Sequence, residues 1–191
     1  MFDSSRAHGI VPAGSEGRDL IILGIDPGLA NTGWGVVEHA GSSFRCLAYG
    51  CVTTSPATST STRLAQVHQE ILGVIARYKP SEAAVESVYF GTNAKTAFAT
   101  GQARGVALLA TAESGLVLGE YGPGEIKMAV VGTGAADKQQ VQYMVRAILG
   151  LSHAPEPDHA ADALAAAICH AHRRGTASIE ERAAAQTGAS Q

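Results

Sequence analysis

The order of the predicted strands and helices constrains the fold of this chain more than any other feature of its sequence. An apolar run over residues 20–25 ends at Asp26-Pro27-Gly28, and two further β-rich stretches follow at residues 34–38 and 44–52. Only short turns separate the three stretches, so we expect them to pair as an antiparallel meander. The meander comes before every predicted helix, which indicates that it forms the start of a sheet.

Helices and strands alternate in the rest of the chain. Apolar residues at helical spacing predict a helix from Ser61 to a stop at Pro80, and residues 83–86 follow as a short buried strand. A meander followed by such βα units predicts an α/β fold, with a mixed antiparallel and parallel sheet flanked by helices. The later segments are an alanine-rich helix over much of residues 93–113 and a last strand at 116–121. The remainder is predicted to be helical, with clear elements at 141–149 and 159–172.

Composition supports one folded domain over residues 19–174. The chain is 46% apolar and 16% charged, which is enough for a packed core. Residues 1–18 lack the basic-then-apolar order of a signal peptide, and we expect a flexible leader there. Residues 175–191 are mostly polar or small, which predicts a disordered tail.

Charge, cysteine content and hydropathy limit the partners and the compartment. The formal net charge is −3, so binding to nucleic acid would need a local basic patch. The three cysteines, Cys46, Cys51 and Cys169, lack the spacing of a disulfide framework or a structural zinc site. No apolar stretch is long enough to span a membrane. We therefore expect a protein of the reducing cytoplasm without a membrane partner.

Two acidic residues lie at the ends of predicted strands. Asp26 stands where the first strand stops, and the turn after it brings its carboxylate to the edge of the sheet, although turn chemistry alone also favours Asp here. Glu86 closes a strand of apolar residues, and a carboxylate in such surroundings needs a cation, a metal or a hydrogen-bond network. An ion pair with Arg104 or a lysine is the alternative to a functional role for Glu86.

A third acidic cluster, Asp158-His159-Ala-Ala-Asp162, opens the last predicted helix. Helical spacing places Asp162 on one face with Asp158 or His159, and helix capping alone would explain Asp158. Asp162 lies in an alanine-rich stretch that lets the helix pack closely, so we expect its carboxylate to point into a shared space. Carboxylates with one histidine and no thiolate suit Mg²⁺ or Mn²⁺, and two such ions can support in-line hydrolysis of a phosphodiester.

Several short motifs follow one another along the chain between Ile21 and His172. They are GIDPG (24–28), TGWGV (32–36), ESVY (86–89), GQARG (101–105), VVG (130–132), Lys138 with QVQ (140–142), and AADALA (160–165). With these motifs in this order, the chain resembles the RuvC family of Holliday-junction resolvases. The resemblance implies a ribonuclease H-like fold and a homodimer with two active sites. It also implies a crossover junction endodeoxyribonuclease, which nicks two strands of four-way junction DNA symmetrically in recombination and DNA repair.

Carried over by position, the resemblance implies that Asp26, Glu86 and Asp162 are catalytic ligands of two metal ions. The remaining acidic position of the family falls on His159, where many members have aspartate, and Asp158 is its rival one residue earlier. A neutral imidazole adds no negative charge, so the second cation should be held less tightly than in an all-carboxylate site. We therefore predict a preference for Mn²⁺ over Mg²⁺.

Three further positions match family residues that act on DNA. Lys127 and Lys138 match lysines implicated in binding the scissile phosphate or stabilising its transition state. Tyr89 matches an aromatic residue that stacks on an unpaired base near the crossover. Solvated surface lysines and a tyrosine packed in the core are the ordinary alternatives. The resemblance also implies the branch-migration proteins RuvA and RuvB as partners.

Three other functions remain open at this point. GIDPG also resembles the first phosphate loop of actin-like ATPases and sugar kinases, but the chain is short for their two lobes, and VGTG at 131–134 lacks the expected aspartate. If His159 disabled metal binding, a junction-binding module without catalysis would remain. A nuclease for RNA or for another branched DNA would use the same ligands.

Overall fold

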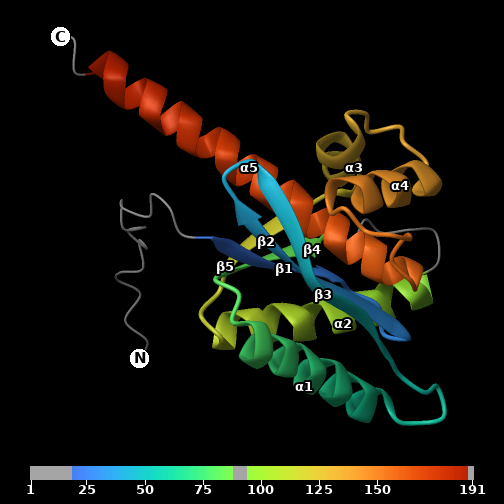
Figure 1. Cartoon of the computed structure of the whole chain (residues 1–191). Helices are drawn as coiled ribbons and strands as arrows, with labels where there is room; N and C mark the ends of the chain where they lie inside the picture. The colour runs from blue at the N-terminus through green and yellow to red at the C-terminus, as the bar shows by residue number, and fades with distance from the viewer. Residues whose placement is uncertain (1–18, 88–93, 189–191) are drawn as a thin grey trace, which may run out of the picture.

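The computed structural model describes residues 19–87 and 94–188, and a five-stranded mixed sheet forms its centre (Figure 1). Its strands are β1 (Leu20–Asp26), β2 (Asn31–Ala40), β3 (Ser43–Thr53), β4 (Glu82–Glu86) and β5 (Val117–Tyr121), in the order β3-β2-β1-β4-β5. β1 pairs antiparallel with β2, and β2 with β3, so the predicted meander is confirmed. β4 and β5 extend the sheet in parallel on the other side of β1.

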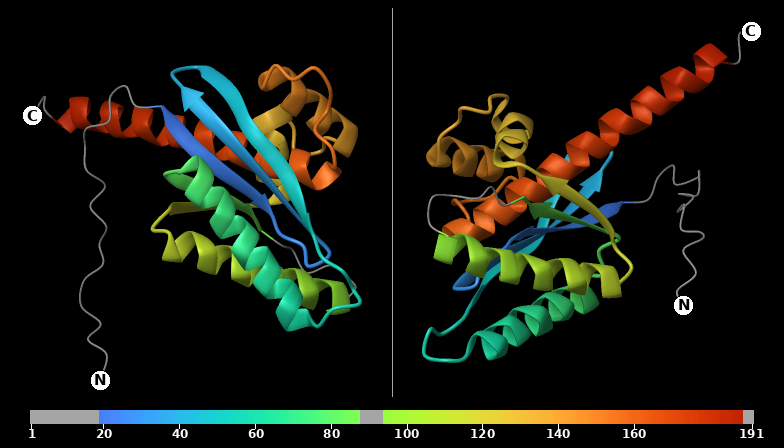
Figure 2. Two further views of the ribbon diagram at one scale, coloured as in Figure 1. Left: turned by 60° about the horizontal axis from the view of Figure 1, so that its bottom comes forward. Right: turned by 180° about the vertical axis from the view of Figure 1, so that it is seen from behind.

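Helices cover both faces of this sheet (Figure 2). On one face lie α1 (Thr60–Tyr78) and α2 (Ala94–Glu113), and on the other lie α3 (Pro123–Val131), α4 (Lys138–Ile148) and α5 (Asp158–Gly188). Neighbouring strand residues point to opposite faces, so Leu23 joins the core that contains α1 residues, whereas Ile22 joins the core that contains α5 residues. Within the described ranges, no helix has the length and apolar character needed to cross a membrane.

Helix α5 lies directly on the backbone of β1 and β2 because glycines face it. A Cβ atom added to Gly24 would lie 1.9 Å from the carbonyl oxygen of Ala163, and one added to Gly33 would lie 1.9 Å from that of His159. Only glycine permits so close an approach. Ala160 and Ala161 are fully buried beside this contact, as the alanine-rich sequence of the helix predicts.

Farther along α5, a buried group of hydrogen bonds joins the helix to the parallel strands. His170 Nε2 lies 2.6 Å from Oε2 of Glu82, and Tyr121 Oη lies 2.8 Å from Nδ1 of the same histidine. The second carboxylate oxygen of Glu82 accepts from Arg174 at 2.8 Å. Both oxygens of Glu82 therefore have partners, as a buried carboxylate requires.

Helix α3 lies in the stretch after residue 121 that the sequence predicts to be helical, although residues 126–131 are nearly all apolar and show no period that fixes the bounds of the helix. One part of the chain differs from the sequence prediction. Helix α5 continues to Gly188, where the composition of residues 175–191 predicts a disordered tail. Ala, Glu, Arg and Gln in that segment are strong helix formers, which accounts for the difference. The flexible leader predicted at 1–18 lies outside the described residues.

Candidate active site

Asp26 ends strand β1 at the edge of the sheet, and the loop after it is tied down by two hydroxyl groups. The buried Thr32 donates a hydrogen bond from Oγ1 to the carbonyl oxygen of Gly28 at 2.7 Å. Thr54 donates from Oγ1 to the carbonyl oxygen of Leu29 at 2.5 Å. These bonds hold the turn that directs the largely buried side chain of Asp26 to the sheet edge.

Helix α5 brings two more polar side chains to Asp26. Its first turn lies against Gly33, and His159 Nδ1 lies 2.7 Å from Oδ2 of Asp26. Asp162 follows about one turn later on the same helix face. One ligand atom from each of Asp26, His159 and Asp162 lies within 4.8 Å of the other two. The close contact between helix and strand therefore assembles three ligands from two distant parts of the sequence.

Glu86 ends strand β4 beside Asp26, because β1 and β4 are parallel neighbours in the sheet. Burial, and then the negative charges of Asp26 and Asp162, raise the pKa of Glu86 from 4.5 to about 7. Burial also raises the pKa of Asp162, and the charge of Asp26 adds to that rise. Carboxylates crowded in this way favour a bound proton or a cation, and such perturbed groups are typical of functional sites.

Two lysines supply positive charge beside the carboxylates. Lys138, the first residue of α4, has its Nζ 3.1 Å from Oδ2 of Asp158 and 3.4 Å from Oδ2 of Asp162. Burial disfavours the charged ammonium, but the hydrogen bond to Asp158 and the charge of Asp162 outweigh it, so the pKa of Lys138 is raised. Lys127 on α3 also lies near enough for its charge to oppose the rise in the pKa of Glu86.

Asp158 lies outside the three-ligand group, at the start of α5. Its Oδ2 contacts Lys138, and its Oδ1 accepts a hydrogen bond from Nε2 of Gln142 at 2.9 Å. These bonds lower the pKa of Asp158. Of the two rival positions, the structure thus places His159, and not Asp158, against Asp26.

Other residues considered from the sequence lie elsewhere or have different partners. Arg104, an alternative partner for Glu86, forms an ion pair with Glu120 of β5 instead. Tyr89 lies outside the described residues. The sequence did not predict the contact of Gly33 with the first turn of α5 or the hydrogen bond from Gln142 to Asp158. The alternate glycines of the TGWGV motif (32–36) are the signal that could have indicated a helix packed directly on β2.

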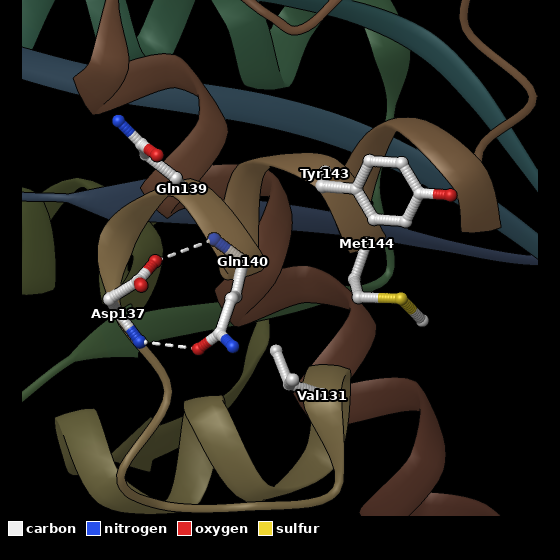
Figure 3. A pocket seen from close by; sticks show the side chains of 6 residues that line it. All are labelled: Val131, Asp137, Gln139, Gln140, Tyr143 and Met144. Atoms are coloured by element: carbon white, nitrogen blue, oxygen red, sulfur yellow. Dashed lines mark hydrogen bonds between the residues drawn. The ribbon is translucent and has the colours of Figure 1, made fainter.

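A pocket of about 370 Å³ lies beside α4, apart from these ligands (Figure 3). In it, the backbone N–H of Gln140 donates to Oδ1 of Asp137 at 2.8 Å, and the N–H of Asp137 donates to Oε1 of Gln140 at 2.9 Å. This reciprocal cap fixes the helix turn from which Lys138 projects. The residues that line the pocket are Val131, Asp137, Gln139, Gln140, Tyr143 and Met144.

The donor set of Asp26, His159 and Asp162 fits a divalent metal ion. Carboxylate oxygens and an imidazole nitrogen are ligands for Mg²⁺, Mn²⁺ and related ions, and the three donor atoms are close enough to share one ion. The pKa of Glu86 is raised by burial and then by the negative charges of Asp26 and Asp162, and a cation would neutralise those charges. The described residues can therefore form a metal-binding group.

The family model and the relatives that match this chain carry the same description. The family model for crossover junction endodeoxyribonuclease RuvC matches residues 22–170. The protein of that name from Pelotomaculum thermopropionicum is 50% identical over 153 residues, which cover 80% of this chain and 93% of the relative. The one from Heliobacterium modesticaldum is 51% identical over 153 residues, with coverage of 80% and 94%.

Solved structures agree with this result and confirm the predicted ribonuclease H-like sheet. T. thermophilus RuvC, solved in complex with a Holliday junction substrate, is 41% identical with a TM-score of 0.78, and the match covers 82% of this chain and 97% of that one. The yeast mitochondrial Holliday junction resolvase Ydc2, 10% identical with a TM-score of 0.56 over 78% of this chain and 77% of its own, shares the fold. This chain belongs to the RuvC family of crossover junction endodeoxyribonucleases.

Proposed function

We propose that this protein is a structure-specific endonuclease that resolves Holliday junctions by hydrolysing one phosphodiester in each of two strands, in recombination and DNA repair. The observation that carries the proposal is the group formed by Asp26, His159 and Asp162, with Glu86 at the end of the neighbouring strand β4. The group has the character of a hydrolytic site without a covalent nucleophile. Family membership assigns the substrate class, since the relatives are crossover junction endodeoxyribonucleases.

The proposed cofactors are two Mg²⁺ or Mn²⁺ ions in each active site, held by Asp26, Glu86, His159 and Asp162. Bound there, they would activate a water molecule and stabilise the leaving oxygen of the cleaved strand. Glu86 must lose its proton before it can act as a ligand, and its raised pKa makes that step dependent on pH near neutrality. A neutral His159 contributes no charge, so we propose that Mn²⁺, which accepts imidazole more readily than Mg²⁺, is preferred.

The lysines have a separate proposed role at the scissile phosphate. Lys138 lies against Asp162, and the charge of Lys127 acts on Glu86, so both place positive charge near the carboxylates. A fixed cation at this place stabilises the negative charge that develops on the phosphate oxygens. Stacking of Tyr89 on an unpaired base near the crossover is also proposed, and it rests on family resemblance alone.

A homodimer is proposed because two strands are cut and the described residues of one chain hold one group of metal ligands. Helix α2 offers a surface for the second copy. Its residues Phe98 and Leu109 are 70% and 51% exposed, and Val117 on the edge strand β5 is also exposed. Large apolar side chains exposed in this way are typical of protein interfaces. Cooperation with RuvA and RuvB in the cytoplasm belongs to the same proposal and rests on the family.

The proposal is tested by nicking of a labelled, immobile four-way junction against a linear duplex of matched sequence, with Mg²⁺, Mn²⁺ or a chelator. Paired, metal-dependent nicks in the junction alone are expected. They should disappear in Asp26→Asn and persist in Asp19→Asn, a control that makes the same chemical change at an exposed residue.

Other outcomes would overturn parts of this proposal. Junction binding without nicking under every metal would indicate a binding module, and equal cleavage of the duplex would indicate a different nuclease. Junction binding should weaken steeply as salt rises, because contacts to phosphates release counterions. Binding that hardly changes with salt would contradict a local basic patch.

A further inference from the structure

The position of Lys138 is not explained by its own helix. It is the first residue of α4, where the helix dipole disfavours a positive charge. Its side chain is half exposed, and a lysine has a long flexible stem that loses much freedom when it is held in one place. An ammonium that must meet a phosphate at one point therefore needs an anchor from another element.

Asp158 provides such an anchor from α5. It lies in the first turn of that helix, where the dipole favours a carboxylate. Its Oδ2 lies 3.1 Å from Nζ of Lys138, nearer than the 3.4 Å between the same nitrogen and Asp162. The contact thus joins the starts of two helices that are distant in sequence.

Gln142 holds the carboxylate of Asp158 from its other side. It lies four residues after Lys138, on the same face of α4, and its Nε2 donates to Oδ1 of Asp158 at 2.9 Å. One oxygen of Asp158 is therefore bound by the amide and the other by the ammonium. Together the two contacts hold the carboxylate of Asp158 against Lys138. Asp158 is not a member of the group formed by Asp26, His159 and Asp162.

We propose that Asp158, oriented by Gln142, is a positioning residue that holds the ammonium of Lys138 at the rim of the ligand group for the scissile phosphate. The inference rests on the proposed nuclease function. Asp162 cannot serve as a lasting anchor, because a carboxylate that binds a metal has less charge to offer the lysine. Asp158 keeps its full charge and remains the partner of Lys138 during the reaction.

The test is single-turnover nicking of the four-way junction by the full chain, at saturating Mn²⁺. Asp158→Asn keeps the bond from Gln142 but removes the charge, and should slow nicking about fivefold, the scale of an exposed ion pair. Asp158→Glu should recover part of this loss. Gln142→Ala should slow nicking about twofold, whereas Gln139→Ala, at an exposed glutamine on the same helix, should match the wild type.

Combining Lys138→Ala with Asp158→Asn tests whether Asp158 acts through Lys138 or independently of it. Lys138→Ala should slow nicking about a hundredfold, as loss of a group that stabilises the transition state does. Adding Asp158→Asn to Lys138→Ala should slow it no further, since residues that act through one another are not additive. Mn²⁺ affinity, measured by calorimetry, and junction affinity without metal should stay within about twofold of wild type in Asp158→Asn.

A measurement that does not depend on activity completes the test. The ¹³C relaxation of the Lys138 Cε group should show greater motion in Asp158→Asn than in wild type. Three results would each overturn the inference. They are a nicking rate of Asp158→Asn equal to that of wild type, additive losses of rate in the double variant, and an unchanged order parameter of the Lys138 Cε group. A large loss of Mn²⁺ affinity would make Asp158 a ligand instead. If the wild type fails to nick junctions, the proposed function is wrong. The order parameter of the Lys138 Cε group would still show whether Asp158 holds Lys138.

Discussion

His159 and His170 lie about three turns apart on α5, and each contacts a carboxylate of the sheet, Asp26 and Glu82 respectively. The two pairs differ in burial. The His159 pair faces solvent at the sheet edge, whereas the His170 pair is enclosed in the core. The first pair is therefore available for a metal, and the second serves to attach the helix.

This difference predicts that His170→Phe destabilises the fold. The substitution leaves the buried carboxylate of Glu82 with Arg174 as its remaining partner, and losing a hydrogen bond to a buried charged group costs about 2 kcal/mol. Tyr121→Phe, which removes one hydroxyl from the same group, should cost about 1 kcal/mol. Urea unfolding measures both values. A free energy of unfolding of His170→Phe within about 0.5 kcal/mol of wild type would contradict the assignment.

Glu86→Gln should stabilise the metal-free protein near pH 8 while it abolishes nicking. Because the pKa of Glu86 rises from 4.5 to about 7 on folding, the folded chain binds more protons than the unfolded chain between these values. The stability that this group contributes is complete below pH 4.5 and is lost as the pH rises to about 7.

The resulting loss in the free energy of unfolding is on the order of 3 kcal/mol at most, and it should not occur in Glu86→Gln because glutamine stays neutral. Thermal unfolding of the two chains near pH 5 and pH 8, in chelator, measures the effect. Glu70→Gln is the control, because Glu70 is exposed on α1. Equal melting temperatures of Glu86→Gln and wild type near pH 8 would show that neither burial nor the neighbouring carboxylates disfavour the charged form of Glu86.

Gly24→Ala should disrupt the contact between β1 and α5. The added methyl group would overlap the carbonyl oxygen of Ala163, and the forced separation should cost about 3 kcal/mol. Gly73→Ala is the matched control in the exposed part of α1, where nothing lies within 4 Å, and it should stabilise by about 0.5–1 kcal/mol. Denaturant unfolding distinguishes the two, and a Gly24→Ala protein as stable as wild type would be inconsistent with this packing.

His159→Asp should shift the metal preference toward Mg²⁺. The change replaces a neutral imidazole by a carboxylate beside Asp26 and Asp162, which adds negative charge and a hard oxygen ligand. Calorimetric titration should show tighter Mg²⁺ binding and a smaller difference between Mg²⁺ and Mn²⁺. His153→Asp makes the same change in an exposed loop and should leave both affinities unchanged. No change of preference in His159→Asp would argue against His159 as a ligand.

The parts of the fold that could be predicted from the sequence are those with a clear period. The apolar run at residues 20–25 and the helical spacing in α1 each fix one kind of element, and the structure agrees with both. Helix α3 lies in a stretch predicted to be helical as a whole, but its bounds could not be placed because the segment is apolar on most sides. Its ends nevertheless carry helix signals, with Pro123 at the first position, Glu125 accepting from the backbone N–H of Gly122, and Gly132 at the C-cap.

The candidate site could be predicted only in part, for a similar reason. Asp26 and Glu86 end adjacent strands, so the strand prediction alone brings them to one edge. The bridge from Lys138 and Gln142 to Asp158 depends on how α4 packs against α5, and no local pattern reports that packing. Contacts between separate helices of this kind are decided by the tertiary structure.

The glycine contact between β1, β2 and α5 has an energetic consequence for metal loading. Backbone atoms have no rotamers, so the spacing between Asp26 and the first turn of α5 is set by peptide groups in direct contact. The conformational entropy lost in bringing these ligands together is spent when the chain folds, and an arriving ion has only a few side-chain torsions left to order.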